Sequence, residues 1–396
     1  MDLSLKHQYL LYKNEILFSY FILKQKLDSM NCYFIFPKEL INIICLFYLS
    51  IKQEKWIDSG DNFYVINTKN GLYGMGQNTN GKLGLGDNKN RKKFEYICNN
   101  VKTFSCGDSH LMVLKNDGLY GCGANDFGQL GLGDLKHCNV LKKVYLQNVL
   151  LISCGELFSY VFTKEGLFSC GCNNDGQLGV GKDFSINLGD DIVLTFTNIN
   201  IFNVFTISCG RNHILIITKD GLFGCGNNNT GQLGLGDGNN EYLFTKINII
   251  NVLALSCGKN QSMILTNDGL FTTGENYFEN LGNCLSHHTT FQKINLDNII
   301  SISCGWRSSI ILTTKGFFVC GVIRNDSCFF NLSENNKVFY TANEIELGKT
   351  LDIHISGGLI MILNKNGLFI KKTFQYLNIV IDQINHKSFN KIDIEI

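Results

Sequence analysis

The stretch most suggestive of chemistry is Gly76–Leu83, whose residues GQNTNGKL nearly form a phosphate-binding loop. In the pattern G-x-x-x-x-G-K-[ST], backbone N–H groups and the lysine hold phosphates, and the final hydroxyl binds Mg²⁺. Here the final position is Leu83, and Gly84–Asp87 does not begin the helix whose N-terminus would face a phosphate. The same frame recurs without lysine as GANDFGQL, GCNNDGQL and GNNNTGQL. Because a nucleotide site occurs once and a structural turn recurs, the frame predicts a repeated turn, and we expect Lys82→Ala to change neither stability nor nucleotide affinity.

Histidines and aspartates at repeated positions are the next candidates. His110 and His213 begin equivalent apolar runs, a periodicity more typical of structural residues than of general bases. An aspartate follows the last glycine of the frame at Asp87, Asp134 and Asp237. A calcium site needs about six to eight oxygen ligands, which no calcium-loop spacing supplies here, so these carboxylates are predicted to accept backbone N–H bonds in turns. The spacing contains no Ser/His/Asp or Cys/His arrangement. We expect no enzyme activity, no catalytic residues, no metal site and no cofactor.

The sixteen cysteines fall in register with the repeats rather than in metal-binding or disulfide patterns. One set follows serine in an S-C-G motif and another precedes glycine in a C-G motif, as expected for a small buried hydrophobic residue. The chain has no C-x-x-C pair, and charged residues interrupt the N-terminal stretch before a signal peptide could form. We therefore expect reduced, structural thiols at Cys106, Cys154, Cys209, Cys257 and Cys304, and at Cys122, Cys170, Cys225 and Cys320.

The composition excludes several classes of protein. A net charge of +1 with 17% charged residues provides no broad basic surface for nucleic acid. The basic run Arg91–Lys93 is too short for chromatin binding. The apolar stretch Leu40–Ile51 is shorter than the roughly 20 residues that a transmembrane helix needs. We expect a soluble, intracellular, monomeric protein in the cytoplasm, with the nucleus as an open alternative, that binds neither membrane nor nucleic acid directly.

Seven internal repeats supply the elements that must position these residues. The glycine of a G-[LF]-[FY] motif recurs at intervals of 47 to 55 residues. Within a unit, apolar runs such as His110–Leu114 and Leu119–Cys122 flank a Lys-Asn-Asp-Gly turn, which is a strong hairpin signal. About four strands in roughly 50 residues is the size of a propeller blade, so the sequence predicts an all-β, seven-bladed propeller. The recurring glycines are Gly71, Gly118, Gly166, Gly221, Gly269, Gly316 and Gly367.

The pattern S-C-G-x-x-H-x(7)-G-L-[FY]-x-C-G-x-N-x-x-G-Q-L-G-x-G-D closely resembles the repeat of the regulator of chromosome condensation family, whose members form seven-bladed propellers. The resemblance covers about residues 56 to 390. It is closest in the first four units and fades in the fifth, where Glu279–Gly282 replaces GQLG. In the sixth and seventh units that turn is gone. The resemblance implies a propeller domain at residues 56–396.

Residues 1–55 lack the regularly spaced glycines of the repeats. Their apolar residues recur every three or four positions, which predicts a helical segment. Phe36–Ile44, with Pro37 suited to a first helical turn, resembles the opening of an F-box, the motif that docks on ubiquitin-ligase adaptors. The propeller begins too early to leave room for a complete F-box. The alternative interpretation of residues 31–50 is a helical cap packed on the propeller.

The residues just after each S-C-G glycine are the candidates for partner binding. Their frame is constant while their side chains vary, which is typical of a recognition loop on a rigid scaffold. They are acidic in units one to three and basic in units four to six, so we predict a face with a negative and a positive half and with Trp306 as an aromatic anchor. The candidates are Asp61, Asp108, His110, Glu156, Arg211, His213, Lys259, Trp306 and Arg307.

Two functions of different class follow from the sequence. The first is a non-enzymatic protein-interaction scaffold, which would act as a substrate-binding adaptor for ubiquitination if the N-terminal helices dock on a ubiquitin-ligase adaptor. The second is a guanine-nucleotide exchange factor for a small GTPase, as some members of the resembled family are. In exchange-active members, acidic and histidine side chains follow the repeat glycine, and Asp108 and His110 occupy those positions here. The fold alone does not choose between them, and we favour the scaffold.

The repeat also predicts two features of the backbone. An open ring would leave two sheet edges unpaired, so we expect the C-terminal strands within 374–396 to pair beside the strands of the first unit. Gly231 and Gly234 are expected to have positive φ or a close backbone contact, because glycine is the residue that tolerates both.

Overall fold

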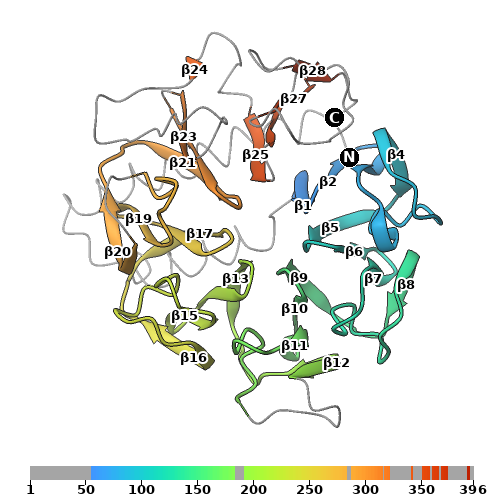
Figure 1. Cartoon of the computed structure of the whole chain (residues 1–396), viewed down its shortest axis with the longest axis horizontal. Helices are drawn as coiled ribbons and strands as arrows, with labels where there is room; N and C mark the ends of the chain where they lie inside the picture. The colour runs from blue at the N-terminus through green and yellow to red at the C-terminus, as the bar shows by residue number, and fades with distance from the viewer. Residues whose placement is uncertain are drawn as a thin grey trace, which may run out of the picture. The chain divides into compact units, whose positions relative to one another are not determined.

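The computed structural model describes residues 55–182, 191–282, 287–314, 316–321, 340–341, 350–356, 359–364, 367–372 and 390–392. These residues form seven four-stranded antiparallel sheets, which follow one another around a ring in sequence order (Figure 1). The predicted seven-bladed propeller is therefore confirmed. The predicted N-terminal helices and the F-box-like segment at residues 31–50 lie outside the described residues.

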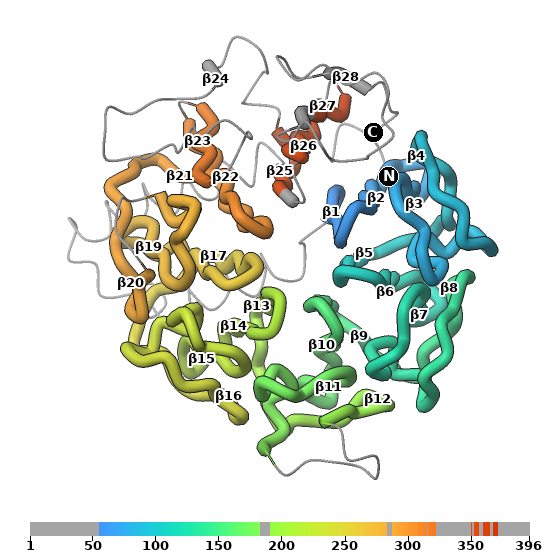
Figure 2. The backbone as a smooth tube through the Cα atoms, viewed as in Figure 1, coloured from blue at the N-terminus to red at the C-terminus, as the bar shows by residue number. Residues whose placement is uncertain are grey.

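Each blade consists of four consecutive strands paired in sequence order, and the first strands, such as β1, β5, β13 and β17, lie innermost (Figure 2). The third-to-fourth-strand loop of blade one contains a short 3₁₀ helix, η1 (Thr79–Gly81). Blades one to four comprise β1 (Ile57–Gly60), β2 (Phe63–Thr68), β3 (Gly71–Gly76), β4 (Arg91–Cys98), β5 (Val101–Cys106), β6 (His110–Lys115), β7 (Gly118–Gly123), β8 (Cys138–Val144), β9 (Val149–Cys154), β10 (Phe158–Thr163), β11 (Gly166–Cys172), β12 (Ile192–Asn198), β13 (Val204–Cys209), β14 (His213–Thr218), β15 (Gly221–Gly226) and β16 (Glu241–Ile247).

The last three blades repeat the same arrangement with shorter outer strands in blades six and seven. They comprise β17 (Val252–Cys257), β18 (Gln261–Thr266), β19 (Gly269–Gly274), β20 (His288–Ile294), β21 (Ile299–Cys304), β22 (Ser308–Thr313), β23 (Gly316–Gly321), β24 (Tyr340–Thr341), β25 (Thr350–Ser356), β26 (Leu359–Asn364), β27 (Gly367–Lys372) and β28 (Asn390–Ile392).

The central hairpin of each blade forms where the sequence predicted it. In blade two, Lys115 of β6 pairs with Gly118 of β7, so Asn116 and Asp117 form a two-residue turn. The second strands are almost completely buried, because neighbouring sheets cover both of their faces. This burial explains why these strands are continuous apolar runs rather than alternating ones.

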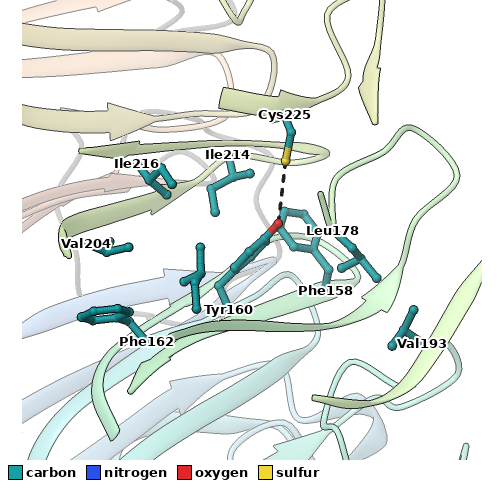
Figure 3. Close-up of a cluster of buried hydrophobic side chains, with 10 residues drawn as sticks. Phe158, Tyr160, Phe162, Leu178, Val193, Val204, Ile214, Ile216 and Cys225 are labelled. Atoms are coloured by element: carbon teal, nitrogen blue, oxygen red, sulfur yellow. Dashed lines mark hydrogen bonds between the residues drawn. The ribbon is translucent and has the colours of Figure 1, made fainter. Parts of the chain in front are cut away.

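The hydrophobic core lies between adjacent blades rather than within one sheet. Between blades three and four, Phe158 and Tyr160 of β10 pack towards Ile214 and Ile216 of β14 (Figure 3). The Tyr160 hydroxyl donates to the carbonyl oxygen of Gln177 at 3.1 Å, so its polar end is satisfied inside the core. Each blade is therefore stabilised by its neighbours, as expected for a repeat architecture.

The G-x-N-x-x-G-Q-L-G frame forms the loop between the third and fourth strands. In blade two, the Asn125 side chain accepts from the Leu130 N–H at 2.9 Å and donates to the Asp134 carbonyl at 2.7 Å and carboxylate at 3.1 Å. Asp134 accepts the Lys136 N–H at 3.0 Å. The same bonds recur at Asn78 and Asp87 and at Asn228 and Asp237. The predicted turn carboxylates are confirmed.

The predicted backbone role of the loop glycines is also confirmed. Gly231 has φ +80° and Gly234 has φ +71°, a region that disfavours residues with a side chain. A Cβ on Gly231 would collide with the backbone of Thr289, and one on Gly234 would collide with the Phe291 ring. Both contacts cross to the outer strand β20 of the next blade, so the glycines permit close approach between blades.

The S-C-G motif joins the innermost strands of neighbouring blades. Ser105 Oγ accepts the Cys154 N–H at 3.1 Å, and Ser256 Oγ accepts the Cys304 N–H at 2.8 Å. The same bond links blade three to four and blade four to five. Cys209 is half-buried and the other S-C-G and C-G cysteines are buried, all as free thiols, which agrees with their predicted structural role. Burial raises the pKa of the Cys304 thiol to about 11.

The ring closes differently from our expectation. The C-terminal strand β28 pairs with β27 and completes blade seven, whereas blade one is built from its own four strands, so the prediction of a shared blade was wrong. Closure comes instead from contacts between β25 and β1. The Asp352 carboxylate accepts the N–H groups of Trp56 and Ile57, each at 3.1 Å, and Ser59 Oγ lies 2.8 Å from His354 Nε2. These polar contacts, together with an apolar cluster that blades one and seven share, join the two blades without strand pairing.

Candidate functional site

The candidate partner-binding residues lie on one face of the propeller. Because neighbouring strands are antiparallel, the loop between the first and second strands of every blade lies on the same face as the loop between the third and fourth strands. We call this the loop face. The two-residue hairpins between second and third strands lie on the opposite face.

Backbone hydrogen bonds link the first-to-second-strand loops of neighbouring blades. The Asp61 N–H donates to the Asp108 carbonyl at 2.9 Å, and the Glu156 N–H donates to the Arg211 carbonyl at 3.0 Å. Further round, the Arg211 N–H donates to the Lys259 carbonyl at 3.3 Å, and the Lys259 N–H donates to the Gly305 carbonyl at 3.2 Å. The loops therefore present variable side chains from a fixed backbone.

Three carboxylates form the acidic half of the loop face: Asp61, Asp108 and Glu156. Among the described residues, the Asp108 carboxylate has no hydrogen-bond donor, while that of Asp61 accepts the side-chain amide of Asn62 at 2.9 Å. Partial burial, followed by the charges of Glu156 and Asp61, raises the pKa of Asp108 to about 7. The negative charge of this half therefore varies near neutral pH.

An ion pair marks the boundary between the two halves. The Arg211 guanidinium binds the Glu156 carboxylate through two bonds, Nη2–Oε1 at 2.9 Å and Nε–Oε2. A two-pronged contact of this kind fixes both side chains more firmly than a single bond would. The basic half begins at this pair and continues through Lys259 to Arg307.

Aromatic rings accompany the cations of the basic half. Lys259 Nζ lies 4.6 Å from the ring centroid of Trp306, and the Arg307 guanidinium carbon lies 4.7 Å from that of Phe278. Trp306 remains 45% exposed. We call Lys259, Phe278, Trp306 and Arg307 the cation–aromatic cluster. Cations over ring faces are attracted by the ring quadrupole, so the cluster is held together by its own side chains.

His110 and His213 lie beneath the loop face and are fully buried. His110 Nε2 lies 2.9 Å from Ser159 Oγ of the next blade, and the Ser159 hydroxyl donates to the Gln129 carbonyl at 2.7 Å. Because the Ser159 hydroxyl proton is directed at Gln129, His110 Nε2 must carry the proton of the neutral imidazole and donate it to Ser159 Oγ. The other ring nitrogen, Nδ1, then has neither a proton nor a hydrogen-bond partner. His213 makes the equivalent bond to Ser262. Their predicted structural role is confirmed, and neither belongs to the exposed candidate surface.

Lys82 is also a structural residue. Its side chain is buried, and Nζ donates to the Asp61 carbonyl at 2.7 Å and lies 5.1 Å from the Phe63 ring centroid. The lysine occupies the position that glutamine has in the other GQLG turns, so the turn interpretation is supported. Because the side chain is buried, we expect Lys82→Ala to destabilise the protein, in contrast to the expectation from the sequence.

Phe278 and its neighbour Tyr277 are parts of the loop face that the sequence reasoning missed. Tyr277 is 70% exposed and lies with its ring centroid 4.2 Å from that of His287. Both aromatic residues follow Asn276, at positions that polar residues occupy in most of the units that keep this frame. This replacement of polar by aromatic residues is the sequence signal that could have identified them.

Two further kinds of feature are absent from the part of the chain that the structure describes. No group of three or more His, Cys, Asp or Glu side chains there could hold a metal ion. No helix among the same residues has the length and apolar character to cross a bilayer.

Comparison with protein families identifies the repeat. The family described as "Regulator of chromosome condensation (RCC1) repeat" matches residues 69–114, 116–162 and 165–217, and a second family of the same description matches residues 101–129 and 206–232. No curated protein sequence matches the chain.

Solved structures with the same architecture include that of human WBSCR16, which is 21% identical with a TM-score of 0.63 and covers 79% of this chain and 89% of that chain. Yeast RCC1 (Prp20) bound to Kap60 is 19% identical with a TM-score of 0.62, covering 81% and 80%. Prp20p from Saccharomyces cerevisiae, described with its binding to Gsp1p and histones, is 18% identical with a TM-score of 0.61, covering 85% and 84%. At these identities the likeness concerns the fold. The chain is therefore a seven-bladed propeller in which segments of residues 69–232 match the regulator of chromosome condensation repeat.

Proposed function

We propose that this protein is a non-enzymatic protein-interaction scaffold that binds its partner through the loop face. One observation carries the proposal: variable, oppositely charged side chains project from loops whose backbones are hydrogen-bonded to one another. A rigid backbone reduces the ordering cost of binding, and varied side chains provide specificity. The exposed Trp306 adds a residue type that is frequent among binding hot spots.

The charge distribution suggests how a partner approaches. A partner with the opposite arrangement of charge would be attracted to both halves in only one orientation. Such attraction acts mainly on the association rate and is screened by salt. We therefore expect association to slow as ionic strength rises.

Affinity purification with the full-length protein, followed by kinetic measurements on the recovered partner, tests the proposal. We expect Trp306→Ala to weaken capture by about tenfold or more and Asp108→Lys to slow association. Asp220→Lys is the matched control, because Asp220 is exposed in a hairpin on the opposite face. If both loop-face variants fold normally and recover the same partners at unchanged rates, the loop face is not the binding surface.

Guanine-nucleotide exchange on a small GTPase is the second candidate. The acidic half supports it, because Asp61 and Asp108 are partly exposed and could contact a cationic GTPase surface. One structural neighbour, Prp20p, is described with its binding to Gsp1p. Against it, His110 is buried and cannot reach a partner. Release of fluorescent GDP from a panel of small GTPases is the test, and exchange that Asp108→Asn abolishes would favour this function over the scaffold.

The role as a substrate-binding adaptor for ubiquitination depends on residues 31–50 and remains a prediction. Comparing the partners captured by the full chain and by residues 56–396 would test it. Loss of a ubiquitin-ligase adaptor from the shorter chain, with other partners retained, would support the role.

A further inference from the structure

The cation–aromatic cluster brings together two cations, Lys259 and Arg307, beside aromatic rings. In the described part of the chain, neither Lys259 nor Arg307 forms an ion pair with a carboxylate, whereas Arg211 is paired with Glu156. Burial, and then the positive charges of Arg211 and Arg307, lower the pKa of Lys259. The negative charge of Glu275 acts in the opposite direction, although the two side chains form no ion pair. An anion bound beside these neighbouring cations would be attracted by each of them and would reduce their mutual repulsion.

The cluster is already ordered in the free protein. Lys259 lies over the Trp306 ring, and the Arg307 guanidinium carbon lies 4.7 Å from the Phe278 ring centroid and 5.8 Å from that of Trp306. Long cationic side chains normally lose rotamer freedom when they bind a ligand, and those already held against a ring lose less. The exposed part of Trp306 and the neighbouring Tyr277 leave apolar surface beside the charges.

The neighbouring acidic half restricts the anion that fits. A nucleic-acid strand carries phosphates along its whole length, so a strand crossing the loop face would meet Glu156 and Asp108. The net charge of +1 provides no general attraction to such a strand. A short run of carboxylates within a polypeptide can be confined to the basic half, and an adjacent apolar residue can pack on Trp306.

We propose that the cation–aromatic cluster binds a short acidic peptide segment of the partner. Carboxylates of the segment contact Lys259 and Arg307, and an apolar side chain next to them packs against Trp306. This inference rests on the proposed function, because it assigns a ligand class to one half of the loop face.

Fluorescence anisotropy with the full chain tests the proposal. The probe is a labelled peptide in which glutamates flank a single leucine, and the comparator has lysines in place of the glutamates. We expect the acidic peptide to bind more tightly and its affinity to fall with salt. Lys259→Ala and Arg307→Ala should each weaken binding by about fivefold, and Trp306→Ala by about tenfold. Trp306→Phe should retain most of the affinity because it keeps an aromatic face.

Lys164→Ala is the matched control, because Lys164 is an exposed lysine in a hairpin on the opposite face and its removal should not change binding. Thermal melting of each variant establishes that it is folded. Equal affinity for the two peptides, or unchanged binding by Arg307→Ala and Trp306→Ala, would overturn the proposal. So would a labelled single-stranded DNA that binds more tightly than the acidic peptide and is weakened by the same variants. If the acidic peptide fails but Trp306→Ala still loses the purified partner, the ligand class is wrong and the loop face remains the binding surface.

Discussion

The two buried histidines predict a specific loss of stability in acid. In native protein, burial lowers the pKa of both His110 and His213 to about 3, against about 6.5 for an exposed histidine. The unfolded chain therefore takes up protons first as the pH falls, and protonation favours unfolding. The contribution is fully present above about pH 7 and is lost progressively between about pH 6.5 and pH 3.

The magnitude follows from the two pKa values. Proton uptake by each histidine should lower the free energy of unfolding by about 1.4 kcal/mol for each pH unit below about 6.5. The loss for one histidine therefore reaches about 2 kcal/mol at pH 5. The pair together should cost about 4 kcal/mol at pH 5, a large part of the stability of an ordinary domain. His354, whose pKa burial lowers to about 4, contributes in the same direction and remains in every variant below.

The chain itself offers the substitution that tests this. Gln261 occupies the equivalent position in blade five, and its Nε2 donates to Ser309 Oγ at 2.9 Å, as His110 Nε2 does to Ser159. The double variant His110→Gln and His213→Gln should therefore keep both bonds and lose both titrations. Urea unfolding between pH 7.5 and pH 5 measures the free energy. We expect the pH dependence of the double variant to be shallower by about 4 kcal/mol over that range.

A matched control uses the exposed His137. Its Nδ1 accepts the Asn125 N–H at 3.1 Å, and Asn90 and Asn240 accept the same bond in blades one and four. His137→Asn should therefore keep the turn, and its comparison with the double variant separates the loss of two buried imidazoles from the loss of an exposed one. If the double variant loses stability in acid as steeply as the unmodified protein, the buried histidines are not the acid-sensitive groups and the reasoning fails.

Three further substitutions test the blade contacts by urea unfolding at neutral pH. Gly231→Val should cost more than about 1 kcal/mol because of its positive φ. Gly238→Val should cost far less, because a Cβ there would come no closer than 3.6 Å to its neighbours and the backbone is outside the positive-φ region; equal costs would contradict the strain argument. Lys82→Ala should destabilise the protein, and Lys82→Gln, the residue of the equivalent turns, should be better tolerated; an unchanged stability of Lys82→Ala would show that the buried ammonium contact is unimportant. Asp352→Ala should cost about 2 kcal/mol or more, since two backbone N–H groups lose their acceptor; a neutral effect would mean that the ring closes by packing alone.

The repeat made most of the fold predictable, because each turn and hairpin depends on local residues that recur. The closure of the ring did not follow from the repeat. Asn390–Ile392 lacks the glycine pattern, and an unpaired sheet edge can accept a strand from either neighbouring blade. The buried position of Lys82 was also missed, because lysine is usually exposed and only the three-dimensional contact with the Asp61 carbonyl accounts for it.

The candidate site was predictable in outline only. The constant frame with variable side chains located the loops. It did not show that His110 is fully buried while Asp108, two residues away, is partly exposed. Phe278 was missed because it comes from the third-to-fourth-strand loop of blade five and approaches Arg307 of blade six only in space. Sequence spacing describes neighbours along the chain, whereas this surface joins loops of adjacent blades.

The closure of the ring has a consequence for how such a protein changes over generations. Every blade, including the first and the last, takes its four described strands from consecutive stretches of sequence, since none of these strands is exchanged across the junction of β25 and β1. A duplication or loss of one such stretch in the gene would add or remove an intact sheet and leave the others complete. The inner serine-to-cysteine bonds would re-form with the new neighbour wherever the S-C-G motif is kept. A ring built in this way can vary its number of blades by recombination at any boundary, and each new blade would bring its own recognition loop to the surface.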